Sequence, residues 1–191
     1  HEVIRIPRFS LEARTQVALS GTSGTGKTTF LHLIAGILTP DSGTVTLDSQ
    51  PMSALSEAAR DRLRATDIGY IFQTFNLLQG FTVLENVLLG MSFGPGADRG
   101  RAVELLERVG LSQRLHHFPR QLSTGQQQRV AVARALAHRP KLVLADEPTG
   151  NLDTVNAREA LALIREGCAE NDAALLLVSH DPGVLSRFEN Q

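Results

Sequence analysis

The strongest structural signal in this chain of 191 residues is an eight-residue segment, GTSGTGKT, at residues 21–28. It matches the pattern G-x-x-x-x-G-K-[ST], in which glycines let the main chain turn tightly and approach a phosphate group. The N–H groups of such a loop surround an anion at the positive end of the following helix. Lys27 adds a point charge for the outer phosphates, and the hydroxyl group of Thr28 is a suitable ligand for Mg²⁺. The segment therefore predicts a nucleotide-binding site.

The residues on both sides of this phosphate loop support the same interpretation. Residues 16–19 have the pattern of a short strand that leads into the loop, and apolar residues recur at helical spacing from 30 to 38. A chance match to the pattern would lack these flanks. We expect the following residues to contact the nucleotide: Gly21, Thr22, Ser23, Gly24, Thr25, Gly26, Lys27, Thr28 and Thr29.

Strand and helix patterns alternate along most of the chain. Two apolar runs, at 142–145 and 173–178, are typical of parallel strands that are buried on both faces. Strands are expected at 3–6, 10–13, 17–19, 44–47, 68–72, 142–145 and 173–178. Helices are expected after residue 28 and at 56–64, 83–89, 101–109, 112–116, 126–137 and 157–166.

These elements predict one α/β domain over residues 1–191. Its core, at about 1–74 and 138–191, is expected to be a P-loop NTPase fold, with a RecA-like sheet and flanking helices. The segment at about 75–137 contains only helical patterns and is expected to form a helical subdomain. The strands expected before the phosphate loop predict a small N-terminal antiparallel β portion.

Composition limits the other classes of function. The formal net charge is −1, so no overall positive field favours nucleic acid as a partner. Cys168 is the only cysteine, which excludes an internal disulfide bond and a cysteine-rich metal site. The apolar run at 173–178 is too short to span a bilayer, and no signal-peptide pattern opens the sequence. We expect a soluble, cytoplasmic protein that reaches a membrane only through a partner.

A pair of carboxylates follows the first of the two buried strands. Asp146 is placed where P-loop enzymes hold Mg²⁺, and Glu147 could activate a water molecule for attack on the γ-phosphate. The alternative is a strand-end pair that caps the turn at Pro148. The phosphate loop elsewhere in the chain favours the catalytic interpretation.

Three further polar positions have both a functional and a structural interpretation. Gln73 ends a strand and could offer its amide oxygen to a metal, or could be a turn residue. Ser123 and Gly125 precede a helix and form either a second anion-binding helix terminus or an ordinary cap. His180 follows the last strand, where a lone histidine is more often structural than catalytic.

Taken together, the motifs resemble those of the ATP-binding cassette (ABC) ATPases from the strand before the phosphate loop to His180. The resemblance rests on GTSGTGKT, the loop at Gln73, LSTGQQQRV (122–130), LVLADEP (142–148), NLD (151–153) and SHD (179–181). The segments ADEPTGNLD (145–153) and FTVLENV (81–87) are most similar to the lipoprotein-release, macrolide-export and cell-division branch of that family.

The resemblance implies a role for each matching position within one subunit. Lys27 and the loop amides would hold the phosphates of ATP. Thr28 and Gln73 would bind Mg²⁺ directly, and Asp146 would hold it through water. Glu147 would be the general base, and His180 would contact the γ-phosphate.

The resemblance also implies a head-to-tail homodimer with two ATP molecules between the subunits. Ser123, Gly125 and Gln126 would bind the ATP of the opposite subunit, and Asp153 would line the dimer interface. The segment after Gln73 would receive a short helix of an integral membrane partner, so that the protein would lie on the cytoplasmic face of the membrane.

The chain departs from the family pattern at two places. Thr124 stands where the family signature LSGGQ has the first of its two glycines, so a β-branched residue lies beside the predicted γ-phosphate site. The aromatic residue that stacks on adenine in the family lies well upstream of the phosphate loop. Only 20 residues precede Gly21, and Phe9 is expected to belong to the core instead.

We therefore expect the nucleotide-binding subunit of an ABC transporter, which hydrolyses MgATP to drive a membrane partner. One alternative is an ABC-type ATPase that signals through a membrane complex without transport. Another is a non-transport member that acts on DNA or ribosomes. The chain lacks the long coiled coil of the chromosome-type members and the second cassette of the ribosome-type members.

Overall fold

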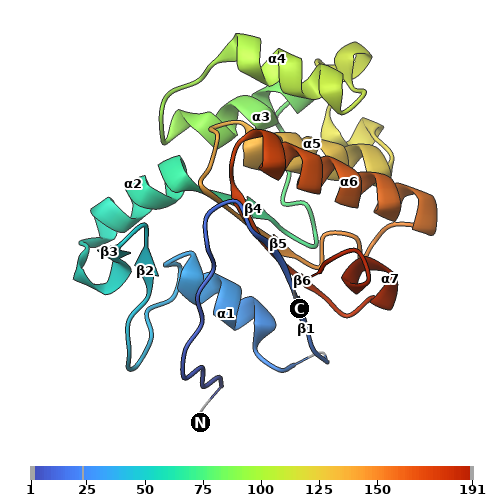
Figure 1. Ribbon diagram of the computed structural model, residues 1–191. Coiled ribbons are helices and arrows are strands. Elements are labelled where there is room, and N and C mark those ends of the chain that lie inside the picture. Colours follow the sequence, from blue (N-terminus) through green and yellow to red (C-terminus); the bar gives the residue numbers. More distant parts are fainter. Residues whose placement is uncertain (1–2, 23, 190–191) are drawn as a thin grey trace.

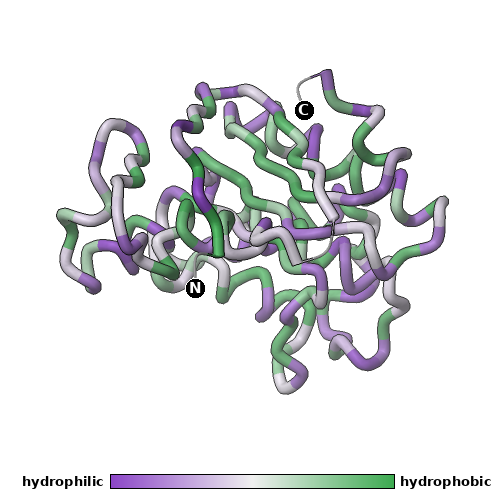
Figure 2. Tube along the Cα trace, turned by 90° about the horizontal axis from the view of Figure 1, so that it is seen from below, coloured by the Kyte–Doolittle hydropathy of each residue, from purple (hydrophilic) through white to green (hydrophobic). Residues whose placement is uncertain are grey.

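A four-stranded parallel sheet forms the centre of the fold (Figure 1). The structure, a computed structural model, describes residues 3–22 and 24–189. The strands are β1 (Gln16–Ser20), β6 (Ala174–Ser179), β5 (Leu142–Asp146) and β4 (Ile68–Ile71), in that spatial order. The apolar runs at 142–145 and 173–178 are the two central strands, β5 and β6, as their continuous hydrophobicity predicts. In Figure 2 the hydrophobic strands accordingly run through the middle of the molecule.

Helices cover both faces of this sheet. Leu142 and Leu144 of β5 pack in one cluster with Leu31 of α1 (Lys27–Ile34) and Leu63 of α2 (Glu57–Asp67). Val143 alternates with them and packs on the other face. There the cover is α5 (Thr124–Leu136), α6 (Thr154–Glu170) and the short α7 (Pro182–Leu185). The alternation of side chains along each strand thus fills two separate layers of core.

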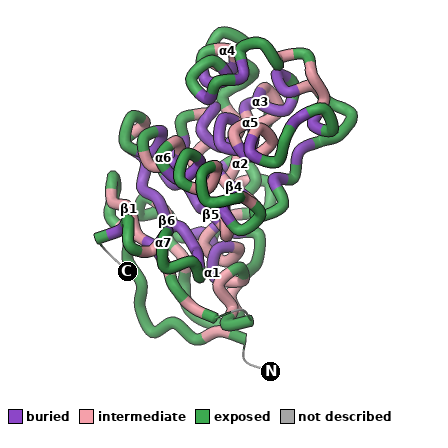
Figure 3. Tube along the Cα trace, turned by 90° about the vertical axis from the view of Figure 1, so that its right-hand side faces the viewer, coloured by how far each residue is buried: buried purple, intermediate pink, exposed green. Residues whose placement is uncertain are grey.

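A third hydrophobic cluster lies away from the sheet, between α3 (Val83–Ser92), α4 (Arg99–Arg108) and α5. Figure 3 shows α3 and α4 as a lobe at one end of the molecule. Helix α5 belongs to both parts, because Val130 and Ala131 face this cluster while Val132 faces the sheet. The helical segment expected at 75–137 corresponds to this lobe, and its boundaries as a subdomain stay a prediction.

The remaining elements are short. The expected helix at 112–116 is only a 3₁₀ turn, η2 (Ser112–Arg114), and two further 3₁₀ turns are η1 (Met52–Ala54) and η3 (Pro119–Gln121). A small antiparallel sheet is present as expected, but it follows the phosphate loop instead of preceding it. It consists of β2 (Thr46–Leu47) and β3 (Gln50–Pro51). In the part of the chain that the structure describes, no helix is long and apolar enough to cross a membrane.

The prediction of strands at 3–6 and 10–13 is wrong. Described residues 3–13 contain no strand, and Val3 and Ile6 are exposed. Apolar alternation makes a strand only where a neighbouring strand offers hydrogen bonds, and β1 pairs with β6 alone. Pro7 also removes one of the donors that such a ladder needs. Ile4 instead lies near Gly26 of the phosphate loop.

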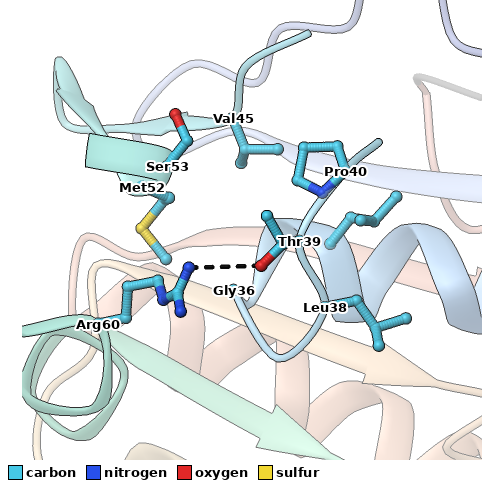
Figure 4. Close-up of a pocket in the computed structure, with 9 residues that line it drawn as sticks. Gly36, Leu38, Thr39, Pro40, Val45, Met52, Ser53 and Arg60 are labelled. Carbon is cyan, nitrogen blue, oxygen red and sulfur yellow. Dashed lines mark hydrogen bonds between the residues drawn. The ribbon is translucent and has the colours of Figure 1, made fainter. Parts of the chain in front are cut away.

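The turn after α1 lies against Met52, the residue that follows β3. Gly36 has φ +65°, and a Cβ there would lie 2.5 Å from the Cε of Met52. Figure 4 shows Met52 pointing toward this turn, next to Arg60, whose Nη1 donates to Thr39 Oγ1 at 3.4 Å. Glycine at position 36 therefore permits both the left-handed turn and the close approach of Met52.

Gly69 allows β4 to pack directly against α5. A Cβ at this position would lie 2.3 Å from the carbonyl oxygen of Ala135, which is helix main chain and cannot move alone. We expect Gly69→Ala to lower the free energy of unfolding by about 1–3 kcal/mol, as overpacking does. Urea unfolding followed by circular dichroism measures this difference.

Gly80→Ala is the matched control for Gly69→Ala. A Cβ at Gly80 meets no described atom within 4 Å. We expect this exposed substitution to change stability by no more than about 0.5 kcal/mol. Equal unfolding midpoints for the two variants would show that β4 and α5 are not as closely packed as described.

Candidate nucleotide-binding site

The polar residues singled out in the sequence gather at one edge of the sheet. Because β1, β4, β5 and β6 are parallel, their carboxyl ends meet at the same edge. Ser20 lies opposite Ser179, so the phosphate loop and His180 leave adjacent strands side by side. Asp146 ends β5 opposite Val178. Open α/β sheets bind ligands at this edge.

The phosphate loop curls around the ammonium group of Lys27. Lys27 Nζ donates to the carbonyl oxygens of Gly21 and Thr22, both at 2.7 Å. Gly24 and Gly26 have φ values of +83° and +86°, which side chains rarely adopt. Gly26 is also the N-cap of α1, so the loop amides lie at the positive end of that helix. Of the loop residues expected to contact the nucleotide, Ser23 lies outside the described residues.

Thr28 and Asp146 are brought together from positions 118 residues apart. The Thr28 hydroxyl donates to Asp146 Oδ2 at 2.8 Å. Two oxygen donors at this distance fit a hard cation such as Mg²⁺, which takes one or two protein ligands together with phosphate oxygens and water. Among the described residues, no group of three or more histidine, cysteine or acidic side chains is placed to hold a metal ion by itself. The donor set thus fits Mg²⁺ carried by a nucleotide.

Glu147 and His180 form a pair beside the Thr28–Asp146 contact. His180 Nδ1 lies 2.7 Å from Glu147 Oε1, and the Glu147 side chain is only 13% exposed. Glu147 has φ +44°, an uncommon value for glutamate, and the turn is fixed by its N–H, which donates to Val178 O at 3.0 Å. Backbone strain of this kind often occurs at functional residues. The sequence predicted roles for both residues, but not this contact between them.

Gln73 lies in an exposed turn just beyond β4. Its carbonyl oxygen accepts from Asn151 Nδ2 at 2.8 Å, so the segment after β5 contacts the segment after β4. Its Nε2 lies 3.3 Å from the position of a Cβ built on Gly150. Gln73 is therefore next to the turn that follows Glu147. Sequence reasoning assigned no role to Asn151.

Ser123 and Gln126 cap α5 reciprocally. Gln126 N donates to Ser123 Oγ at 3.3 Å, and Ser123 N donates to Gln126 Oε1 at 3.0 Å. Within one subunit, these two residues therefore form an ordinary helix cap, which was the structural alternative for this segment. Gly125 is buried, and a Cβ there would lie 2.3 Å from Asn156 Oδ1. Within residues 3–22 and 24–189, no hydrogen bond or ion pair joins residues 123–126 to the phosphate loop.

Asp153 is the N-cap of α6. Its Oδ1 accepts from the N–H groups of Val155 and Asn156, both at 3.0 Å, and its Oδ2 accepts from Asn156 Nδ2. The hydrogen bonds from Asn156 hold the pKa of this carboxyl below its ordinary value. Asn156 therefore contacts both Asp153 and Gly125, so the NLD segment and the start of α5 are adjacent in one subunit.

Phe9 is not a core residue, contrary to expectation. The residue is 41% exposed, and its ring meets the ring of Phe30 edge-on, with centroids 5.1 Å apart. The segment around it has no strand neighbour that would bury its second face.

Comparisons with known proteins find relatives for most of the chain. Residues 4–150 match the family model described as ABC transporter. The chain is 46% identical over 180 residues to the lipoprotein-releasing system ATP-binding protein LolD of Shewanella frigidimarina, covering 92% of this chain and 75% of that protein.

Two solved structures with 36% sequence identity also match, and each covers 95% of this chain and 81% of the other. One is a dimeric post-hydrolysis state of the ATP-binding cassette MJ0796 bound to ADP and Pi, with a TM-score of 0.86. The other is a dimeric structure of MJ0796, described as a bacterial ABC transporter cassette, with a TM-score of 0.84.

Proposed function

This chain belongs to the ABC transporter family of ATP-binding proteins, and from that premise we propose how its residues bind and hydrolyse ATP. The observation that carries the proposal is the meeting of four elements at one sheet edge. The phosphate loop, the Thr28–Asp146 contact, the Glu147–His180 pair and the Gln73 turn all lie there. Together they supply a phosphate cradle, oxygen ligands for Mg²⁺ and a carboxylate for proton transfer.

The phosphate loop binds the outer phosphates of ATP. Lys27 exchanges its bonds to the Gly21 and Thr22 carbonyl oxygens for bonds to phosphate oxygens, which are the stronger acceptors for an ammonium group. The main-chain N–H groups of residues 21–29 add a cradle that needs no side chains.

Thr28, Gln73 and Asp146 would hold Mg²⁺ when MgATP is bound. The ion would supply positive charge to offset the charge of the phosphate groups while the phosphoryl group is transferred to water. Asp146 accepts a hydrogen bond from Thr28, and so fixes the orientation of the hydroxyl oxygen.

Glu147 accepts the proton of the attacking water. Its carboxylate is largely enclosed, and its contact with His180 fixes the orientation of the carboxyl group. The His180 side chain is 67% exposed, so a γ-phosphate bound at this edge of the sheet can contact its ring.

The complete site is formed by two copies of the chain arranged head to tail. Among the described residues, no hydrogen bond joins Ser123, Gly125 or Gln126 to the phosphate loop of their own subunit. A capped helix N-terminus suits the γ-phosphate of the opposite one. Asp153 lies beside Gly125 through Asn156 and so borders the same interface. The related MJ0796 cassette is described as dimeric with ADP and Pi bound.

The dimer drives an integral membrane partner from its cytoplasmic side. Leu78 and Phe81, after the Gln73 turn, are each 42% exposed and offer apolar area for a short helix of that partner. The relative LolD belongs to a lipoprotein-releasing system. A signalling complex without transport is the alternative, and reconstitution with the membrane subunit distinguishes them by whether cargo moves as ATP is hydrolysed.

Combined replacement of Leu78 and Phe81 by aspartate tests the membrane contact. The isolated protein should hydrolyse ATP at the parent rate, since neither side chain belongs to the proposed site. The variant should no longer copurify with the membrane subunit that the parent chain retains in detergent. If the variant still copurifies with that subunit, the membrane partner contacts other residues than Leu78 and Phe81.

Thr124→Gly tests the one departure inside the signature. Thr124 is the exposed first residue of α5 and takes no part in the Ser123–Gln126 cap. We expect the ATP affinity of the monomer to stay unchanged, because the signature acts only on the opposite subunit. ATP-dependent dimerisation, measured by analytical ultracentrifugation, should become stronger. If dimerisation and hydrolysis are both unaltered, Thr124 does not border the γ-phosphate.

A further inference from the structure

The main chain that follows Gln73 is held by side chains from other parts of the fold. We call residues 73–78 the Gln73 loop. Arg134 Nη2 donates to the carbonyl oxygen of Phe75, and Arg134 Nη1 donates to that of Asn76, each at 2.6 Å. These bonds join the last turn of α5 to a loop 58 residues earlier in the sequence. The two carbonyl groups lie two and three residues after Gln73.

The ends of the loop are held as well. Asn151 Nδ2 donates to the Gln73 carbonyl oxygen at 2.8 Å. The fully buried Asn86 accepts from Leu78 N at 2.8 Å and donates to Leu78 O at 3.1 Å. Arg134 therefore holds the middle of the loop, and the two asparagines hold its ends.

The middle of the loop has a conformation that needs external support. Phe75 and Asn76 have φ values of +60° and +49°. The left-handed region is unfavourable for a bulky residue such as phenylalanine. The two charge-assisted bonds from Arg134 are contacts that this conformation provides and an extended chain would lose.

Arg134 is partly buried and has no carboxylate partner among the described residues. Burial alone lowers the pKa of its guanidinium group below the ordinary value. Gly90 of α3 permits the close packing around it, because a Cβ there would lie 2.6 Å from Arg134 O and 2.9 Å from Arg134 Cγ. A buried charge is costly unless it is well paired, and here the loop carbonyls are the partners. The two terminal nitrogens of the guanidinium group each donate to one of two adjacent carbonyl groups, in the fixed geometry of a planar fork.

We propose that Arg134 is a positioning residue for Gln73, which holds the Gln73 loop so that the Gln73 amide stays at the Mg²⁺ site. This inference rests on the proposed role of Gln73 as a Mg²⁺ ligand. Arg134 lies on the same helix as Ser123, so α5 joins the signature cap at one end to the Gln73 loop at the other. Over 13 residues the helix spans about 20 Å, at 1.5 Å per residue.

Arg134→Met tests the inference in the full chain. Methionine keeps much of the length and the apolar contacts, but loses both bonds to the loop. We expect kcat for ATP hydrolysis to fall roughly 10- to 100-fold, the usual effect of losing a partner that orients a metal ligand. Affinity for ATP in EDTA should not change, because the phosphate loop is intact. The gain in nucleotide affinity on adding Mg²⁺ should shrink.

A double-variant cycle with Gln73→Ala separates positioning from general damage. If Arg134 acts through Gln73, the double variant should hydrolyse ATP no more slowly than the slower single variant. Additive losses would overturn the inference, and so would parent-like hydrolysis by Arg134→Met. If Gln73→Ala alone leaves hydrolysis and the effect of Mg²⁺ unchanged, the proposed role of Gln73 fails and the inference fails with it.

Two matched variants control for stability. Arg129→Met removes another arginine of α5, which donates to Val109 O at 3.3 Å and pairs with Glu159, away from the Gln73 loop. It should leave the effect of Mg²⁺ unaltered. Arg134→Lys should fold and restore part of kcat, because lysine can still reach one carbonyl group. An equal loss of the Mg²⁺ effect in Arg129→Met, or no recovery in Arg134→Lys compared with Arg134→Met, would contradict the inference.

Discussion

Glu147→Gln should lower the rate of ATP hydrolysis by about 10²- to 10⁴-fold, the usual effect of losing a general base. Glutamine keeps the shape and one carbonyl oxygen near His180 Nδ1, so the local geometry should survive. It cannot accept the proton of the attacking water. Affinity for ATP should be at least that of the parent, because a negative charge near the γ-phosphate is removed. Steady-state phosphate release and equilibrium nucleotide binding measure the two quantities separately.

Glu107→Gln is the control for this substitution. Glu107 is an exposed carboxylate on α4, far in the fold from the sheet edge that carries Glu147. The same chemical change there should leave hydrolysis at the parent rate. If Glu147→Gln also hydrolyses ATP at that rate, Glu147 is not the base.

Lys27→Ala should weaken ATP binding by roughly 100-fold or more. Lysine is the only side-chain cation of the phosphate loop, and hydrogen bonds to charged groups contribute about 1.5–3 kcal/mol each. The loop amides remain, so the fold should persist. Isothermal titration calorimetry with ATP in EDTA measures the loss without hydrolysis.

Lys141→Ala serves as its control, because Lys141 is the other lysine of the chain. Its ammonium group pairs with Asp48 and Asp67 at an exposed position, where such pairs stabilise a protein little. ATP affinity should not change. Unaltered affinity in Lys27→Ala would refute the assignment of the phosphate loop.

The central part of the fold could be predicted from the sequence because its signals are local. The apolar runs that became β5 and β6 are buried on both faces, and the pattern at 21–28 requires a strand before it and a helix after it. Ser123 was expected to cap a helix, and it does so with Gln126. The fold class and the family were confirmed on this basis.

The errors and omissions arise where distant parts of the chain decide the structure. Residues 3–13 have a strand-like composition but no neighbouring strand to pair with, so the prediction of strands from their pattern alone was wrong. The Glu147–His180 contact joins residues 33 apart, and the Arg134 bonds join residues 58 and 59 apart. Arginine in a helix pattern is usually a solvated residue, and no local signal distinguishes one that holds a loop. The roles of the site residues stay predictions until the variants are measured.

The shared-site dimer is tested most directly by the mass in solution of the Glu147→Gln variant, measured by size-exclusion chromatography with light scattering. With hydrolysis blocked, MgATP should hold two chains together, and the measured mass should be that of two chains. MgADP lacks the γ-phosphate that the opposite Ser123 would bind, so the mass should return to that of one chain. A Glu147→Gln protein that binds MgATP with full affinity and keeps the mass of one chain would contradict the dimer.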